Sequence, residues 1–193
     1  MSPVRFWRQW REEQARRRRA SVYVATLVRE PAEDDVAWLA QFDGARDLDH
    51  ASWELRHARR SLGLLVAERD ALDDRTASDV GRALATALRY DPRIASDKRS
   101  VAEQQLNARL AAYAGVLRAR TGAEATALRL GRVLLTFTAA SDSALFPAEA
   151  LGHAGELLSR YLLEANGALR EAFGAASLPE DVPPSAAAGA PAI

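Results

Sequence analysis

Residues 46–72 read RDLDHASWELRHARRSLGLLVAERDAL, and this stretch decides the fold class. Its apolar side chains recur every three or four positions, the spacing that places them on one face of an α-helix. The face consists of Leu48, Ala51, Leu55, Ala58, Leu62 and Leu65. A long helix with one apolar stripe has to bury that stripe against neighbours, so the stretch predicts a helical core.

The same periodicity continues on both sides of this stretch. Short breaks separate further predicted helices at residues 34–42, 76–88, 100–117, 123–140 and 147–173. Capping-box patterns at residues 76–79 and 100–103 are expected to open two of them. Because short connections favour antiparallel neighbours, we predict an all-α, antiparallel helical bundle of about six to seven helices over residues 31–174. Residues 175–193 are rich in Ala and Pro, and we expect them to be a disordered tail.

The predicted helix at residues 123–140 is apolar on most of its circumference. Such a helix belongs in the middle of a bundle or in an interface between subunits. We therefore expect the protein to be a homo-oligomer or one subunit of a hetero-complex.

Residues 1–30 form a basic N-terminal arm. They hold eight Arg and three Glu, a net charge of +5, whereas the rest of the chain has a net charge of −5. Ser2 and Pro3 predict the start of a helix, with Ser as the cap and Pro in the first helical position. Residues 22–28 then fit either a continued helix or an extended segment that pairs with another chain.

The arm places arginines beside three aromatic side chains, and this combination is the strongest candidate binding site. Trp and Arg together suit an anionic bilayer surface, an acidic protein patch or a nucleic-acid backbone. The opposing interpretation is that the aromatic rings pack back onto the bundle. The candidate residues are Arg5, Phe6, Trp7, Arg8, Trp10, Arg11, Arg16, Arg17, Arg18 and Arg19.

A second candidate lies in the central stretch, where His50, Glu54 and His57 share one helical face with Asp47. Glu54 and His57 have the Glu-x-x-His spacing with which di-iron bundles hold their metals. Those bundles use the motif on two helices, and this chain has it once in that order. We therefore expect a solvated face here and neither a metal nor another cofactor.

Several chemistries are disfavoured by what the sequence lacks. It contains no cysteine, which excludes disulfides and thiolate nucleophiles. It has neither a Gly-x-Ser-x-Gly turn nor a glycine-rich phosphate loop. No stretch approaches the roughly 20 apolar residues of a membrane span, and the apolar run after Arg19 lacks the cleavage site of a signal peptide. Lys98 is the only lysine, which indicates codon bias in a GC-rich, bacterial genome.

We therefore predict a cytoplasmic, non-enzymatic interaction protein. It would be an accessory, scaffold or assembly subunit that docks through its arm onto an anionic membrane surface, a membrane-bound complex or an acidic protein. The alternative is a helical-bundle metalloprotein or small-ligand sensor that uses the face of His50, Glu54 and His57. A nucleic-acid-binding regulator ranks third, because most of the chain is acidic.

Overall fold

The computed structural model describes residues 3–71, 74–119, 122–139 and 145–174, and within these ranges the chain forms helices and no strand. Its α-helices are α1 (Pro3–Leu27), α2 (Glu33–Leu39), α3 (Leu48–Asp70), α4 (Asp74–Arg89), α5 (Arg99–Arg118), α6 (Ala123–Ala139) and α7 (Ala148–Phe173). Two short 3-10 helices, η1 (Ala40–Phe42) and η2 (Ser96–Lys98), precede α3 and α5. The prediction of an all-α bundle is confirmed. The tail predicted at residues 175–193 lies outside the described residues.

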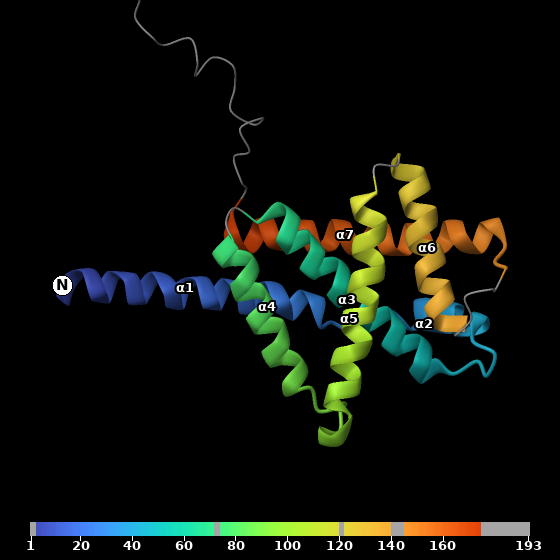
Figure 1. Ribbon diagram of the computed structural model, residues 1–193, viewed down its shortest axis with the longest axis horizontal. Helices are drawn as coiled ribbons and strands as arrows, with labels where there is room; N and C mark the ends of the chain where they lie inside the picture. Colours follow the sequence, from blue (N-terminus) through green and yellow to red (C-terminus); the bar gives the residue numbers. More distant parts are fainter. Residues whose placement is uncertain (1–2, 72–73, 120–121, 140–144, 175–193) are drawn as a thin grey trace, which may run out of the picture.

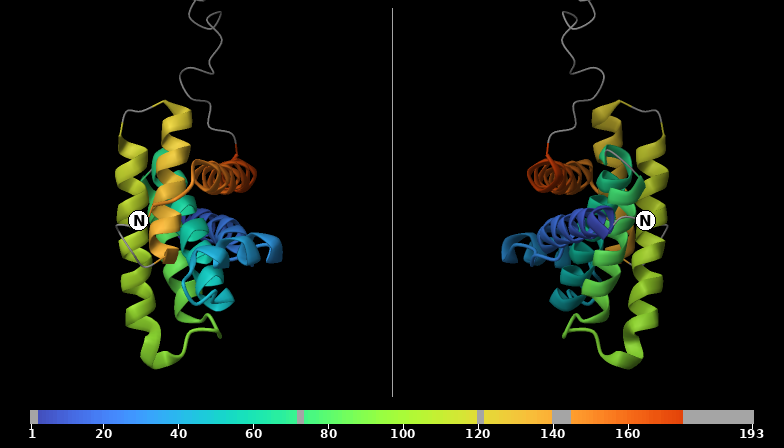
Figure 2. Two further views of the ribbon diagram at one scale, coloured as in Figure 1. Left: turned by 90° about the vertical axis from the view of Figure 1, so that its right-hand side faces the viewer. Right: turned by 90° about the vertical axis from the view of Figure 1, so that its left-hand side faces the viewer.

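The helices form crossing pairs around a central helix. α1 and α7 run antiparallel to each other, and α5 and α6 form a second antiparallel pair that crosses them steeply (Figure 1). Seen along α1 and α7, the α5–α6 pair lies to one side (Figure 2). α3 contacts each of the other six α-helices. The stretch that predicts the fold is therefore the helix on which the other helices pack.

Two apolar clusters make up the core. One lies among α3, α5, α6 and α7 and includes Leu55, Leu62, Leu134, Leu158 and Tyr161. The other joins α1 and α4 to the C-terminal parts of α3 and α7 and includes Tyr23, Leu27, Val66, Leu84 and Leu169. Most of the predicted stripe of α3 is buried, but Leu48 is 57% exposed because it stands in the first turn, beyond the neighbouring helices.

The ends of the helices test the predicted caps. Both capping boxes are wrong: α4 begins at Asp74, which leaves Thr76 inside the helix, and α5 begins at Arg99 with no side-chain cap. The predicted range of residues 147–173 agrees with α7 to within one residue: Pro147 is the N-cap residue, and Gly174, with a φ of 87°, ends the helix. Only glycine adopts that φ without strain.

α6 and α7 cross with their backbones in contact. A Cβ atom added to Gly155 would lie 2.6 Å from the carbonyl oxygen of Ala127, and Gly131 is packed as tightly against α7. Leu130, Leu134 and Leu135 of α6 are buried by this arrangement. Leu128 on the opposite side stays 38% exposed, so α6 is enclosed on one side only.

α1 resolves the ambiguity of residues 22–28. The helix continues through Leu27, and Tyr23, Val24 and Leu27 are buried. The Tyr23 hydroxyl donates a hydrogen bond to the carbonyl oxygen of Gly63 at 2.7 Å. The C-terminal part of the predicted arm is therefore part of the core. None of the helices in the described ranges is long and apolar enough to span a membrane.

Candidate functional site

The first half of α1 extends past the rest of the molecule. The helix is continuous from Pro3 to Leu27 (Figure 1). Ala20 is the first of its described residues that is buried. We call residues 7–19 the outer half of α1. Trp7 is 56% exposed and Trp10 is 46% exposed, so neither ring is buried in the core. Their ring centroids lie 5.9 Å apart in an edge-to-face arrangement, which is a favourable geometry for two aromatic rings.

The arginines of the outer half of α1 differ in their partners. Arg17 pairs with Glu13, and the Nε atom of Arg16 lies 3.7 Å from the carboxylate of Asp79 on α4. Arg8 lies 4.0 Å from Glu12, at the limit of an ion pair. Three further arginines are exposed and form no ion pair with any described residue, namely Arg11, Arg18 and Arg19. The outer half of α1 thus presents unneutralised positive charge.

One face of α1 collects these features. Trp7, Arg11, Arg18 and Val22 follow one another at intervals of four, seven and four residues, which places them on one side of the helix. All four side chains are exposed, and Val22 is 58% exposed although it stands beside the core. The side chains of residues 3–6, which include the candidates Arg5 and Phe6, lie outside the described residues.

The face of His50, Glu54 and His57 on α3 is built differently from its prediction. Asp47 is the N-cap of α3, since its carboxylate accepts hydrogen bonds from the backbone N–H groups of Asp49 and His50. Glu54 and His57 are 3% and 2% exposed. The expectation of a solvated face is therefore wrong, because α5 covers this side of α3.

Glu54 is held by an arginine from α5. The Nε and Nη2 atoms of Arg109 donate to the two carboxylate oxygens at 3.0 Å and 2.5 Å, a bidentate pair. His50 is the second neighbour, with its Nε2 atom 3.5 Å from the same carboxylate. The carboxylate is thus engaged from two sides, and the described residues contain no group of three His, Cys, Asp or Glu side chains that could hold a metal.

His57 lies among positive charges. Burial lowers its pKa to about 3, and the neighbouring charges of Arg109, Arg60 and Arg56 act in the same direction. The imidazole is therefore neutral in the folded protein near neutral pH. Its Nδ1 atom has no hydrogen-bond partner among the described residues. A neutral histidine enclosed in this way is a core residue and is poorly suited to donate a proton to a ligand.

A buried ion pair next to His57 was not predicted from the sequence. Arg60, which is 1% exposed, donates to Asp91 at 3.0 Å. Asp91 follows α4 and also accepts from the Nε atom of Arg93 at 2.8 Å. The segment between the helices predicted at residues 76–88 and 100–117 therefore also has a structural role, because the Asp91 carboxylate ties the end of α4 to α3.

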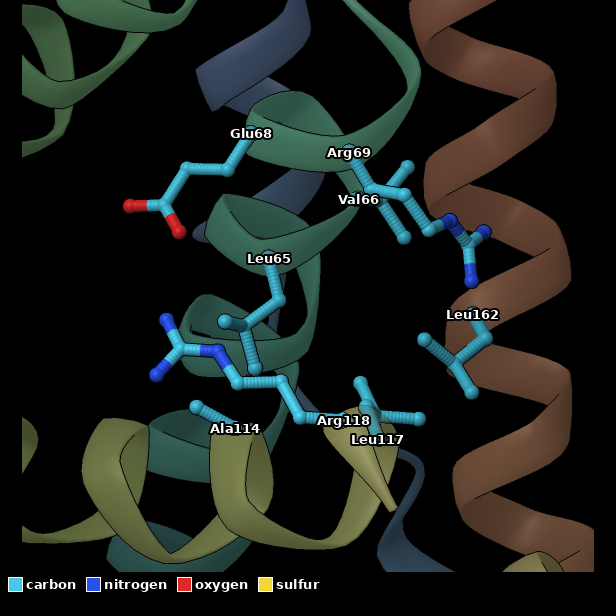
Figure 3. A pocket seen from close by; sticks show the side chains of 8 residues that line it. All are labelled: Leu65, Val66, Glu68, Arg69, Ala114, Leu117, Arg118 and Leu162. Atoms are coloured by element: carbon cyan, nitrogen blue, oxygen red, sulfur yellow. The ribbon is translucent and has the colours of Figure 1, made fainter. Parts of the chain in front are cut away.

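An apolar groove of about 340 Å³ opens between α3, α5 and α7 (Figure 3). Its walls come from Leu65, Val66, Ala114, Leu117 and Leu162. Glu68, Arg69 and Arg118 surround it, and Arg69 extends toward α7 in Figure 3. Since these charges have both signs, the groove does not select one class of charged ligand.

The residues that the structure brings together are thus the exposed Trp and Arg side chains of α1, while Glu54 and His57 belong to the packed interior. The chain matches no protein-family model, no curated protein and no solved structure.

Proposed function

We propose that this chain is a non-enzymatic interaction protein that docks on an anionic membrane surface through the outer half of α1. The observation that supports the proposal is the exposed pair of Trp7 and Trp10 on a projecting helix that also carries unneutralised arginines. Trp rings favour the headgroup region of a bilayer, and arginines bind the lipid phosphates. The anionic leaflet that attracts basic segments faces the cytoplasm, which agrees with the expected location.

The arrangement of charge favours a surface over a pocket. Arg11 and Arg18 lie on the face of α1 that points away from the core, so both can approach a planar partner together with Trp7. Each basic residue near an anionic leaflet contributes about 1 kcal/mol of binding free energy. An acidic protein or a membrane-bound complex would use the same residues, and nucleic acid is the least favoured partner.

The proposal is tested by co-sedimentation with vesicles that contain phosphatidylglycerol, compared with vesicles of phosphatidylcholine alone. We expect binding only to the anionic vesicles, and we expect salt to weaken it, because counter-ions screen exposed charges. R11Q/R18Q is expected to lower the affinity about thirtyfold, the equivalent of two charge contributions. R129Q/R132Q, which changes two exposed arginines of α6, is the matched control and should bind as the wild type does.

The tryptophans separate docking from general charge attraction. W7A/W10A is expected to lose most of the vesicle binding and to change the free energy of unfolding by less than about 0.5 kcal/mol per site, as is usual for exposed positions. Tyr90 and Leu145 are 74% and 95% exposed, so Y90A/L145A is the matched control for loss of exposed apolar area. Full vesicle binding by W7A/W10A would contradict the proposal. Failure of the wild type to bind would leave an acidic protein as the partner to seek.

We further propose that the protein self-associates or belongs to a hetero-complex. The exposed Leu128 and Leu163 line one groove between α6 and α7, which is where an additional subunit would bury apolar area. Sedimentation velocity at micromolar concentration should show that the protein dimerises through this face. A monomer whose sedimentation is the same for the wild type and L128E/L163E would argue against self-association.

A further inference from the structure

α4 crosses α1 near the base of the outer half of α1 (Figure 1). Residues of both helices line a polar groove of about 370 Å³ at this crossing. Its size is that of a site for a small molecule. The lining residues are Arg17 and Ser21 from α1 and Asp79, Arg82, Ala83 and Thr86 from α4. Apart from Ala83, every one of these side chains is polar or charged, which distinguishes this groove from the apolar groove beside α5.

Both helices present an arginine followed four residues later by a hydroxyl. Ser21 donates to the carbonyl oxygen of Arg17 at 3.0 Å, and Thr86 donates to that of Arg82 at 2.9 Å. The hydroxyl oxygens keep free lone pairs, and each hydroxyl can rotate toward a ligand. Two arginines and two hydroxyl-bearing residues thus line one groove.

Ion pairs orient the two guanidinium groups but do not use all of their N–H donors. Glu13 holds Arg17, and Asp79 accepts from the Nη2 atom of Arg82 at 2.6 Å. A guanidinium has five N–H donors, so each arginine keeps donors for a further acceptor. The side chains of Arg17 and Arg82 are 56% and 69% exposed, which leaves these donors accessible.

Asp79 adds a hydrogen-bond acceptor to the groove. Its side chain is 5% exposed, and its Oδ2 atom has no hydrogen-bond partner among the described residues, although the Nε atom of Arg16 lies 3.7 Å away. Oδ2 is thus enclosed beside Arg16, which compensates its charge. Oδ1 accepts from Arg82 and keeps a lone pair, to which a hydroxyl group in the groove can donate. Three arginines and two carboxylates surround the groove, a net charge of +1 that favours an anion.

We propose that this groove binds a small phosphate ester that carries a free hydroxyl group. The phosphate would accept from Arg17 and Arg82, and the hydroxyl would donate to Asp79. Guanidinium groups suit this role because they match the geometry of phosphate oxygens. The inference goes beyond the docking of α1, since the groove can take a soluble ester whether or not Trp7 and Trp10 contact lipid. The headgroup of phosphatidylglycerol offers the same two chemical groups on a membrane.

The test is isothermal titration calorimetry of the full chain with glycerol 3-phosphate as the probe. We expect saturable binding that is weaker for inorganic phosphate, which has no ester hydroxyl. R82Q and R17Q are each expected to lower the affinity at least tenfold, as loss of one hydrogen bond to a charged group does. R89Q, which changes an exposed arginine of α4 outside the groove, is the matched control and should bind as the wild type does. Thermal unfolding of each variant shows whether it is folded.

Two results would overturn the proposal. One is no binding of glycerol 3-phosphate by the wild type up to about 10 mM, beyond which affinity is too weak to be specific. The other is an equal loss of affinity in R82Q, R17Q and R89Q, which would indicate general charge attraction. Vesicles then distinguish a lipid headgroup from a soluble ester as the ligand. If the ligand is the headgroup, R82Q should weaken binding to phosphatidylglycerol vesicles more than binding to phosphatidylserine vesicles. If the ligand is soluble, R82Q should weaken both equally. W7A/W10A should keep its affinity for glycerol 3-phosphate, so failure of one proposal is distinguishable from failure of the other.

Discussion

Replacing His57 by Gln should remove a defined part of the pH dependence of folding. The pKa of His57 is about 3 in the folded protein, against 6.5 for a histidine in an unfolded chain. The folded value is the lower one, so the unfolded state binds a proton first as the pH falls. Stability is therefore fully present above the unfolded pKa, and it is lost progressively as the pH falls through 6.5 toward the folded value.

The size of the effect follows from these two pKa values. Between about pH 7 and pH 5 the unfolded state becomes almost fully protonated at His57 while the folded state remains neutral there, which costs about 2 kcal/mol. The charges of three arginines act on the imidazole, and arginine does not titrate over this interval. The loss is therefore assigned to His57 alone when wild type and H57Q are compared, because every other titrating group is common to both.

Urea denaturation followed by far-ultraviolet circular dichroism at both pH values measures this loss. The free energy of unfolding of the wild type should fall by about 2 kcal/mol more than that of H57Q. H153Q is the matched control for replacing a histidine by glutamine, since His153 is exposed and its ring is tilted against that of Trp38 with a centroid distance of 4.3 Å. A constant difference between wild type and H57Q at the two pH values would refute the burial of a neutral imidazole at this position.

Two further predictions concern packing and charge in the core. G155A should destabilise the protein by about 1–3 kcal/mol, because the new methyl group meets the backbone of α6, whereas G167A on the same helix, with open space around it, should stabilise by about 0.5–1 kcal/mol. Thermal unfolding measures both, and a stabilising G155A would contradict the backbone contact. R109M should cost about 3–5 kcal/mol, because it leaves the buried carboxylate of Glu54 without its bidentate partner. Adding E54Q to R109M should restore part of this loss, and no recovery would show that the carboxylate is not the cause.

The helices were predictable because their cause is local. Apolar spacing and the breaks at Pro and Gly lie in the sequence itself, and α3, α6 and α7 follow the predicted ranges closely. The caps were less predictable, since a Ser or Thr followed by an acidic residue also occurs inside helices. Asp79 illustrates this: it completes a capping pattern in the sequence, but in the structure it pairs with Arg82.

The environment of the candidate residues depends on contacts that are distant in the sequence. Glu54 is buried because Arg109, 55 residues later, covers it. Nothing in the spacing of His50, Glu54 and His57 distinguishes that outcome from a solvated face. The exposure of Trp7 and Trp10 has the same origin, since one helical pattern suits both a core and a surface. The deciding fact is that α4 and α7 do not extend to the first turns of α1, where both tryptophans are exposed.

The continuity of α1 makes the outer tryptophans a rigid extension of the core. Trp7 stands about 20 Å along the helix from Ala20, at a rise of about 1.5 Å per residue, and no break separates the two. Whatever Trp7 contacts is therefore aligned with the whole body, in rotation as well as in distance. Inserting one residue after Ala15 would turn the tryptophan pair by about 100° relative to the body, and inserting seven would turn it by only about 20° while moving it about 10 Å outward. A partner that requires one orientation of the tryptophans would not bind the first variant but would bind the second. The helix therefore fixes the rotation of the docked molecule relative to the body.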